Sequence, residues 1–217
     1  MKQRYFLVIT WVLMSLVGVA QAEQQDPHAL ITSSIERITQ RIDAEREKIK
    51  ADPEYARAMV DEELASLVDF KRITRLVMAR HFSEASKEQK YRFLDVFRSS
   101  LINTYSSGLT LYEGQKINVL PAAEGDVEEN RAAVRTEIST NAGKVIPISF
   151  SLYRNRDSQW MVENVIVNGL NLGKTFRSQF EQSVEQYEGD LDQVIANWSS
   201  AIDLGTEEES PEAPSGA

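Results

Sequence analysis

The chain has 217 residues, no cysteine and a formal net charge of −9 at pH 7. Without cysteine it can form no disulfide, use no thiol in catalysis, bind no metal through sulfur and carry no cysteine-linked lipid. Because 33 acidic residues face 24 basic ones and no basic stripe is present, the composition argues against nucleic acid as a partner.

The first 22 residues have the layout of a secretory signal peptide. Lys2 and Arg4 precede an apolar run from Tyr5 to Val19, and a small-x-small cleavage pattern ends at Ala22. A membrane anchor is the alternative, but a span needs roughly 20 apolar residues and this run is shorter. We therefore expect cleavage after Ala22, a periplasmic protein, and a single domain over residues 23–202. Residues 203–217 are acidic and rich in small polar residues, which predicts a disordered tail.

Helical periodicity dominates the chain up to about residue 112. Asp26 and Asp52 each precede a proline, so each predicts a capped helix start with proline at the first helical position. Ser86 and Gln89 have the spacing of a capping box and predict the start of a further long helix. The expected helices cover residues 27–50, 53–67, 69–82 and about 87–112.

The last of these helices places small residues within its apolar side. Large apolar residues recur every four positions, and smaller ones fall among them. Either another element packs closely against this side, or something that is not protein fills the space. The large residues are Phe93, Phe97, Leu101, Tyr105 and Leu109, and the small ones are Ser100, Thr104 and Gly108.

After Gly114 the hydrophobic period changes from 3.6 to 2, which predicts strands. Four strands are expected as an antiparallel meander with one apolar face, and Pro147 marks an edge or a bulge. Helices follow over residues 173–189 and 191–198, so the fold class is α+β: a helix-rich domain with a curled four-stranded sheet. The expected strands cover residues 115–121, 131–140, 144–155 and 158–167.

No residue set in the sequence motivates catalysis or metal binding. His28 and His81 lie far apart and lack neighbours at metal-ligand spacing, so surface or helix-end positions are favoured over ligand roles. The glycines at 169 and 173 follow a strand and precede a helix, but they lack the spacing of a phosphate-binding loop, so a turn is the better interpretation.

The helix at 69–82 is locally basic within an acidic chain. Lys71, Arg72, Arg75 and Arg80 could meet a phosphate head group or an acidic partner. A solvated charged face is the simpler alternative, and the sequence leaves both open.

Five segments of the chain resemble, in order and spacing, the MlaC or toluene-tolerance (Ttg-type) family of periplasmic phospholipid-binding carriers. The similarity extends from about residue 26 to residue 200. The resemblance implies a fold like that of nuclear transport factor two, enclosing an apolar cavity for the acyl chains of a diacyl phospholipid. The segments are residues 26–31, 52–57, 69–86, 88–105 and 160–180.

The resemblance also implies a role and partners. Members of this family form part of the Mla pathway, which maintains the lipid asymmetry of the outer membrane. The implied partners are an inner-membrane MCE-domain protein of an ABC transporter and an outer-membrane lipoprotein–porin complex. A monomer with no cofactor, no metal and no nucleic acid partner is expected, with phospholipid as cargo.

By position, Leu170 and its neighbours Val165 and Val167 match the segment that lines the family's lipid pocket. Phe93, Phe97, Leu101 and Tyr105 match its long helix. We expect the apolar sheet face and the following helix to bound the same pocket, which adds Ile148, Phe150 and Phe176.

Three positions near the turn depart from the family pattern, in which an acid, an acid and a serine are common. They are Asn164, Asn168 and Asn171, and we expect such departures to bear on lipid selectivity or on the contact with a partner, and not on the apolar lining.

The function expected is therefore passive, non-enzymatic carriage of phospholipid. Two alternatives remain: a carrier of another lipid such as a hopanoid, and an enzyme of the same roll fold acting on a small apolar substrate. An ionisable residue with a shifted pKa deep in the cavity would favour the enzyme.

Overall fold

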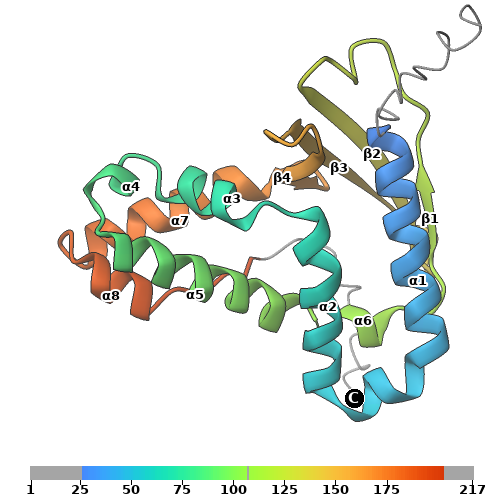
Figure 1. The fold of residues 1–217 in the computed structure, drawn as a ribbon. Coiled ribbons are helices and arrows are strands. Elements are labelled where there is room, and N and C mark those ends of the chain that lie inside the picture. The colour runs from blue at the N-terminus through green and yellow to red at the C-terminus, as the bar shows by residue number, and fades with distance from the viewer. Residues whose placement is uncertain (1–25, 107, 203–217) are drawn as a thin grey trace, which may run out of the picture.

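The computed structural model describes residues 26–106 and 108–202 (Figure 1). The expected signal peptide and acidic tail lie outside the described residues. The helices are α1 (Pro27–Ala51), α2 (Pro53–Leu67), α3 (Phe70–Met78), α4 (His81–Glu84), α5 (Lys87–Tyr105), α6 (Gly108–Leu111), α7 (Leu172–Gln186) and α8 (Leu191–Ala196). The strands are β1 (Lys116–Val119), β2 (Arg131–Ser139), β3 (Val145–Arg154), β4 (Trp160–Val167) and β5 (Leu170–Asn171). The α+β class is confirmed.

Capping side chains set the helix starts, as the sequence predicts. The carboxylate of Asp26 accepts a hydrogen bond from the backbone N–H of His28 at 3.1 Å, and that of Asp52 accepts one from Glu54 at 3.0 Å. The Ser86 hydroxyl accepts from the N–H of Gln89 at 3.1 Å, and the Gln89 side chain accepts from the N–H of Ser86 at 2.9 Å, which completes the capping box.

Two of the predicted helices are interrupted. The helix expected over 69–82 ends at Met78, because Ala79 has a φ of +49° that a right-handed helix cannot accommodate. The long helix ends at Tyr105, and Gly108 begins the separate short helix α6. Neither break contains a proline, and the apolar spacing continues through both. The sequence therefore predicted a continuous helix at each place.

The sheet has five strands, not the four predicted, in the order β1–β2–β3–β4–β5 with every neighbouring pair antiparallel. The fifth strand pairs Leu170 with Val167 across a two-residue turn. Asn168 and Gly169 both have positive φ, 49° and 83°, as this kind of hairpin turn requires. A strand of two residues is too short to show an alternating pattern, which is why the sequence did not reveal it.

Pro147 lies one residue beyond the end of the β3–β4 ladder, which ends at the pair Ile148–Val167, and it is opposite Glu137 of β2. Its carbonyl oxygen still accepts a hydrogen bond from the backbone N–H of Asn168 at 2.9 Å, so the position is the end of a ladder and not a free edge. A separate irregularity in the register occurs between Ser151 and Leu152.

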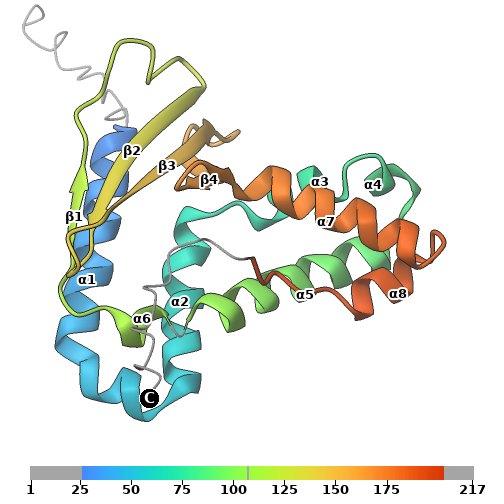
Figure 2. The ribbon, with the colours of Figure 1, turned by 180° about the vertical axis from the view of Figure 1, so that it is seen from behind.

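The molecule has a helical end and a sheet end (Figure 1). Helix α1 runs along the sheet and contacts β1 and β2. At the other end α3, α5, α7 and α8 pack together, and the view from behind shows α7 and α8 beside α5 (Figure 2). Helices α3 and α7 both contact β4, so they join the two ends. Among the described residues, no helix is long and apolar enough to cross a membrane.

Candidate functional site

One face of the sheet is apolar along most of its length. Directly opposed residues of antiparallel strands share a face, so the pairs Val134–Phe150 and Phe150–Val165 place three apolar side chains together. The same register adds further positions, and the one ionisable residue among them is Arg154, which lies opposite Trp160 with its guanidinium 4.7 Å from the ring centroid. The others are Ile117, Val119, Ala132, Thr136, Ile138, Ile146, Ile148, Leu152, Trp160, Val162 and Val167.

This face is covered at one end and half-buried at the other. Ile31 of α1 and Leu67 of α2 pack against Leu152 and Trp160, which are 1% and 2% exposed. Elsewhere on the face, apolar side chains remain half-buried, and we call them the open sheet face. They are Ile117, Val119, Ile138, Ile148, Phe150 and Val165.

Of the predicted site residues, five lie on or beside this face. Ile148 is opposite Val167, Phe150 is opposite Val165, and Val167 is opposite Leu170. Val167 is buried and the other four are half-buried. The structure therefore brings these five together, from three strands.

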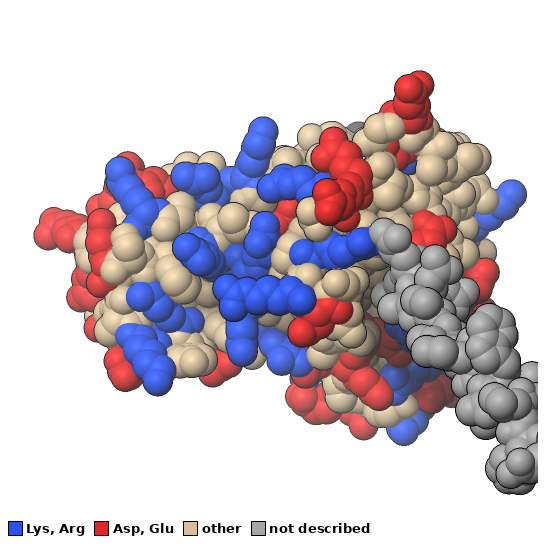
Figure 3. Space-filling view, turned by 45° about the horizontal axis from the view of Figure 1, so that its top comes forward, with Lys and Arg blue, Asp and Glu red and all other residues tan. Residues whose placement is uncertain are grey.

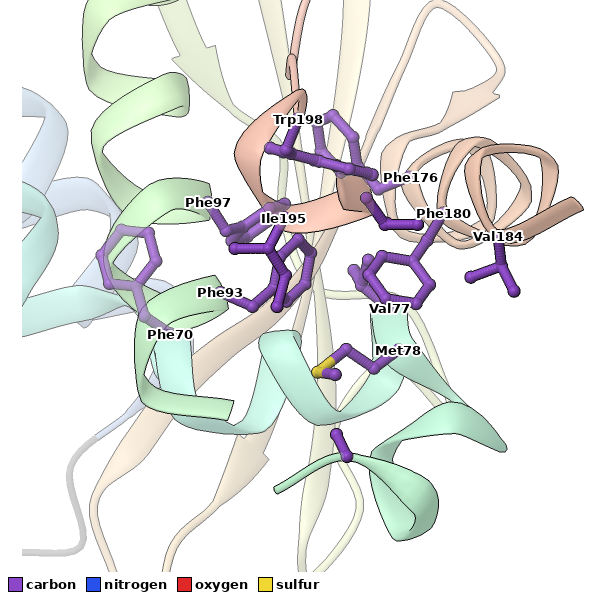
Figure 4. Packing of buried hydrophobic residues seen from close by; sticks show 12 residues of the cluster. Phe70, Val77, Met78, Phe93, Phe97, Phe176, Phe180, Val184, Ile195 and Trp198 are labelled. Carbon is purple, nitrogen blue, oxygen red and sulfur yellow. The ribbon is translucent and has the colours of Figure 1, made fainter. Parts of the chain in front are cut away.

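The three predicted phenylalanines lie elsewhere, in the core of the helical end (Figure 4). Phe93 and Phe97 are 0% exposed and Phe176 is 4% exposed. The ring of Phe93 lies 4.8 Å from that of Phe180, and the ring of Phe97 lies 5.4 Å from that of Phe176, centroid to centroid. In the described structure these rings contact one another and Trp198.

Leu101 and Tyr105 lie at the other end of α5 and are half-buried. Leu101 packs against the core of the helical end. The Tyr105 hydroxyl donates a hydrogen bond to the backbone oxygen of Ser200 at 3.1 Å, and burial raises the pKa of this tyrosine. Tyr105 is thus held by the segment that follows α8.

The row of small residues has no single explanation. Ser100 lies under that same segment, because its hydroxyl accepts a hydrogen bond from the backbone N–H of Ser200 at 2.8 Å. Close packing therefore accounts for Ser100. Gly108 lies outside α5, and a Cβ at this position would meet no atom within 4 Å.

Two of the three asparagine departures hold the start of α7. Asn171 accepts a hydrogen bond from the N–H of Lys174 at 3.0 Å, and Asn164 accepts one from the N–H of Gly173 at 2.9 Å. Asn168 is exposed in the turn before β5. The first two therefore have a clear structural role.

The only strongly buried acid described is already paired. Glu63 of α2 is 8% exposed, and it accepts hydrogen bonds from Arg37 at 2.8 Å and Arg41 at 3.1 Å of α1. Burial alone would raise the pKa of Glu63, but these hydrogen bonds outweigh burial and hold the pKa below its ordinary value. An ionised, paired carboxylate is a poor general acid.

The basic residues of α3 and the following turn separate into two groups. Arg72 pairs with Glu163 and lies 3.9 Å from the ring centroid of Tyr153, while Arg80 pairs with Glu181. Lys71 instead points into a small surface pocket shared with α4 and α5. Lys87 and Lys90 of α5 also line this pocket, and the prediction from sequence did not include them. Their spacing of three residues places both on one face of a helix, which was a usable signal.

Nothing in the described residues forms a metal site, since no three His, Asp or Glu side chains are grouped suitably there. What the described structure offers is a largely apolar sheet face and an extensive apolar core, with Arg154 as the ionisable residue at the covered end of that face.

Comparison with known proteins identifies the family. A family model described as MlaC protein matches residues 32–200. The chain belongs to the MlaC family.

Two relatives and one solved structure illustrate the range of similarity within and around this family. The toluene tolerance protein ttg2D of Pseudomonas putida is 32% identical over 192 residues, covering 88% of each chain. The intermembrane phospholipid transport system binding protein MlaC of Haemophilus influenzae is 26% identical over 174 residues, covering 78% of this chain and 80% of that one. A phospholipid-binding protein from Ralstonia solanacearum, solved in complex with a phospholipid, has a TM-score of 0.71 at 24% identity. The matched region covers 79% of this chain and 94% of that one, and the likeness supports the α+β fold.

Proposed function

We propose that this member of the MlaC family is a periplasmic carrier of diacyl glycerophospholipid, with the acyl chains against the open sheet face. The observation that carries the proposal is the open sheet face itself: its six apolar residues are half-buried, none of them is ionisable, and Arg154 lies opposite Trp160 at the covered end. The relatives support it, because one is named for intermembrane phospholipid transport and another was solved with a phospholipid bound.

The physical requirement for a carrier is burial of the lipid tails. Two acyl chains contain about 30 methylene groups, and exposing them to water costs on the order of 20 kcal/mol at ~0.8 kcal/mol each. A lipid that crosses an aqueous compartment must therefore be covered by apolar protein surface. Ile148, Phe150, Val165 and Leu170 provide such surface from three strands.

The contribution of α5 in this proposal differs from that of the sheet. Leu101 and Tyr105 are half-buried and lie at the end of α5 where lipid contact is possible. Phe93, Phe97 and Phe176 form a rigid aromatic support behind them, because their rings are already packed against protein. We therefore assign these three rings to the wall of the site and not to its surface.

Carriage requires no catalytic group, and the proposed mechanism is a difference in lipid affinity between the carrier and its partners. As family partners we propose the MCE-domain protein of an inner-membrane ABC transporter and an outer-membrane lipoprotein–porin complex. No chemical step at the open sheet face is assigned, because none of the six residues that define it is an acid or a base.

Native mass spectrometry of the protein, purified from its own host without detergent, tests the proposal. We expect a stoichiometric adduct that organic extraction identifies as a diacyl phospholipid. A hopanoid adduct would support a carrier function but contradict the proposed lipid class. An empty protein, or one with a bound polar metabolite, would contradict the carrier function and favour an enzyme.

A further inference from the structure

A second recess lies between α3, α4 and the first turns of α5, away from the sheet. It has a volume of about 250 Å³, and we call it the lysine pocket. Three lysines surround it, and its walls are apolar. The lysines are Lys71, Lys87 and Lys90, and the apolar residues are Phe82, Tyr91 and Leu94.

These lysines differ from their basic neighbours in having no carboxylate partner within the described chain. Arg72, Arg80 and Arg92 each form an ion pair with an acid. Lys90 instead lies 4.8 Å from the ring centroid of Phe82, and Lys87 lies 5.9 Å from that of Tyr91.

The acids close to the pocket do not neutralise it. The carboxylate of Glu84 in α4 lies 3.0 Å from Nδ1 of His81, and Glu88 is exposed at the start of α5. Figure 3 shows Lys and Arg side chains gathered over the end of the molecule that carries α3 and α4. An acidic protein therefore presents a local site of positive charge.

A buried polar group also faces the pocket. Thr74 lines it and is only 2% exposed, and its hydroxyl has no hydrogen-bond partner among the described residues. Unpaired buried hydroxyls are costly, so a ligand that accepts a hydrogen bond here is favoured. Three cations and one free donor at an apolar recess fit a carboxylate-bearing ligand.

The chain itself contains a segment of this chemistry. Residues 203–217 include five acids and no lysine or arginine. Their acids are Asp203, Glu207, Glu208, Glu209 and Glu212. We propose that the lysine pocket binds this acidic C-terminal segment of the same chain.

The reach of the segment is sufficient. The described chain ends at Ile202, close to Tyr105, whose hydroxyl holds Ser200. At about 1.5 Å per residue, α5 spans about 21 Å from Tyr105 back to Tyr91 in the pocket. At about 3.3 Å per residue, an extended chain places Glu209 about 23 Å and Glu212 about 33 Å beyond Ile202.

The tether makes a weak contact effective. A short flexible linker gives an effective concentration in the millimolar range, so a contact with a millimolar dissociation constant is about half occupied. The interaction is electrostatic and near the surface, and it weakens as the Debye length falls from about 10 Å at 0.1 M salt to about 3 Å at 1 M. This inference does not depend on the proposed lipid cargo.

A nitroxide on the segment measures this contact, and the absence of native cysteine makes the labelling specific. Ser210→Cys carries the label, and paramagnetic broadening of backbone amides is recorded on the otherwise intact protein. At low salt we expect the amides of residues 87–91 to lose most of their intensity, because a nitroxide that is nearby for about half of the time strongly raises their averaged transverse relaxation rate. The amides of β2 should be unaffected, and 1 M salt should restore the lost intensity.

Charge variants decide whether the lysine pocket is responsible. The triple variant Lys71→Gln, Lys87→Gln, Lys90→Gln should abolish the broadening, as should Glu207→Gln, Glu208→Gln, Glu209→Gln in the segment. The matched control Lys50→Gln, Lys116→Gln, Lys174→Gln, which changes three exposed lysines on α1, β1 and α7, should retain it.

Three results would overturn the proposal. The first is an absence of broadening at low salt, which would favour an acidic partner protein as the ligand of the pocket. Another is broadening that survives both sets of charge variants. The third is broadening between separate spin-labelled and isotope-labelled chains in a mixture, which would assign the contact to a second copy.

Discussion

The side-chain oxygen of Asn164 on β4 accepts a hydrogen bond from the backbone N–H of Gly173 in the first turn of α7, at 2.9 Å. The approach is so close that a Cβ on Gly173 would lie 2.7 Å from this oxygen. The contact joins the sheet end to the helical end next to the Asn168–Gly169 turn. Glycine at 173 is therefore required by close approach and not by its backbone angles.

Gly173→Ala should destabilise the protein by about 1–3 kcal/mol, because the new methyl group forces Asn164 to move. Urea denaturation followed by circular dichroism measures the change in the free energy of unfolding. Gly108→Ala is the matched control, since a Cβ there meets no atom within 4 Å and alanine favours a helix. Equal midpoints for Gly173→Ala and the parent protein would contradict the close contact.

Asn164→Asp should retain or increase stability, by up to about 1 kcal/mol, because a carboxylate at a helix N-terminus is favoured by the helix dipole. Asn164→Ala should lose about 1 kcal/mol, since the N–H of Gly173 then has no side-chain acceptor. Thermal denaturation compares the variants. Asn168→Asp, in the exposed turn, serves as control and should change little, and an equal loss for Asp and Ala at 164 would disprove the capping role.

Leu170→Glu should remain folded and lose bound lipid, because it would place an unpaired carboxylate beside the acyl chains at a cost of several kcal/mol. Native mass spectrometry measures the bound fraction, and near-ultraviolet circular dichroism checks the fold. Leu76→Glu is the control, since Leu76 is 48% exposed on α3 and lies away from the sheet face. A Leu170→Glu protein that remains fully loaded would remove Leu170 from the proposed site.

Glu63→Gln should destabilise the protein by about 1–3 kcal/mol at pH 7, because Arg37 and Arg41 lose their charged acceptor. The pKa of Glu63 is lowered in the folded protein, so its stabilising effect is present above the ordinary glutamate pKa of 4.5 and is lost as pH falls through the folded value. Urea midpoints measured from pH 7 down to pH 3 test this. The two proteins should converge at the acid end, and a constant difference would refute the linkage.

Deleting residues 206–217 should leave lipid content unchanged, because the lysine pocket lies on α3, α4 and α5 and not on the open sheet face. Native mass spectrometry of the truncated and full-length proteins, prepared in parallel, compares their bound fractions. Loss of lipid on truncation would show that the segment covers the cargo, and the separation of the two sites would then be wrong.

The sequence by itself determined the helix starts and the nature of the sheet face. Asp26, Asp52 and Ser86 act within one turn of their own position, so their capping role is visible without tertiary information. The alternation that includes Ile148 and Phe150 has a period of two, and the strands confirm a shared face. Both are short-range properties of the chain.

Tertiary structure alone decided which apolar side chains are covered by other parts of the protein. Phe93 and Ile148 are equally apolar in sequence, yet remote rings from α7 and the segment after α8 cover Phe93, while Ile148 stays half-buried. Lys71 and Lys90 meet only because α3 and α5 pack together. Periodicity fixes which side of an element is apolar, but the element that packs against that side is set by long-range contacts that no local pattern encodes.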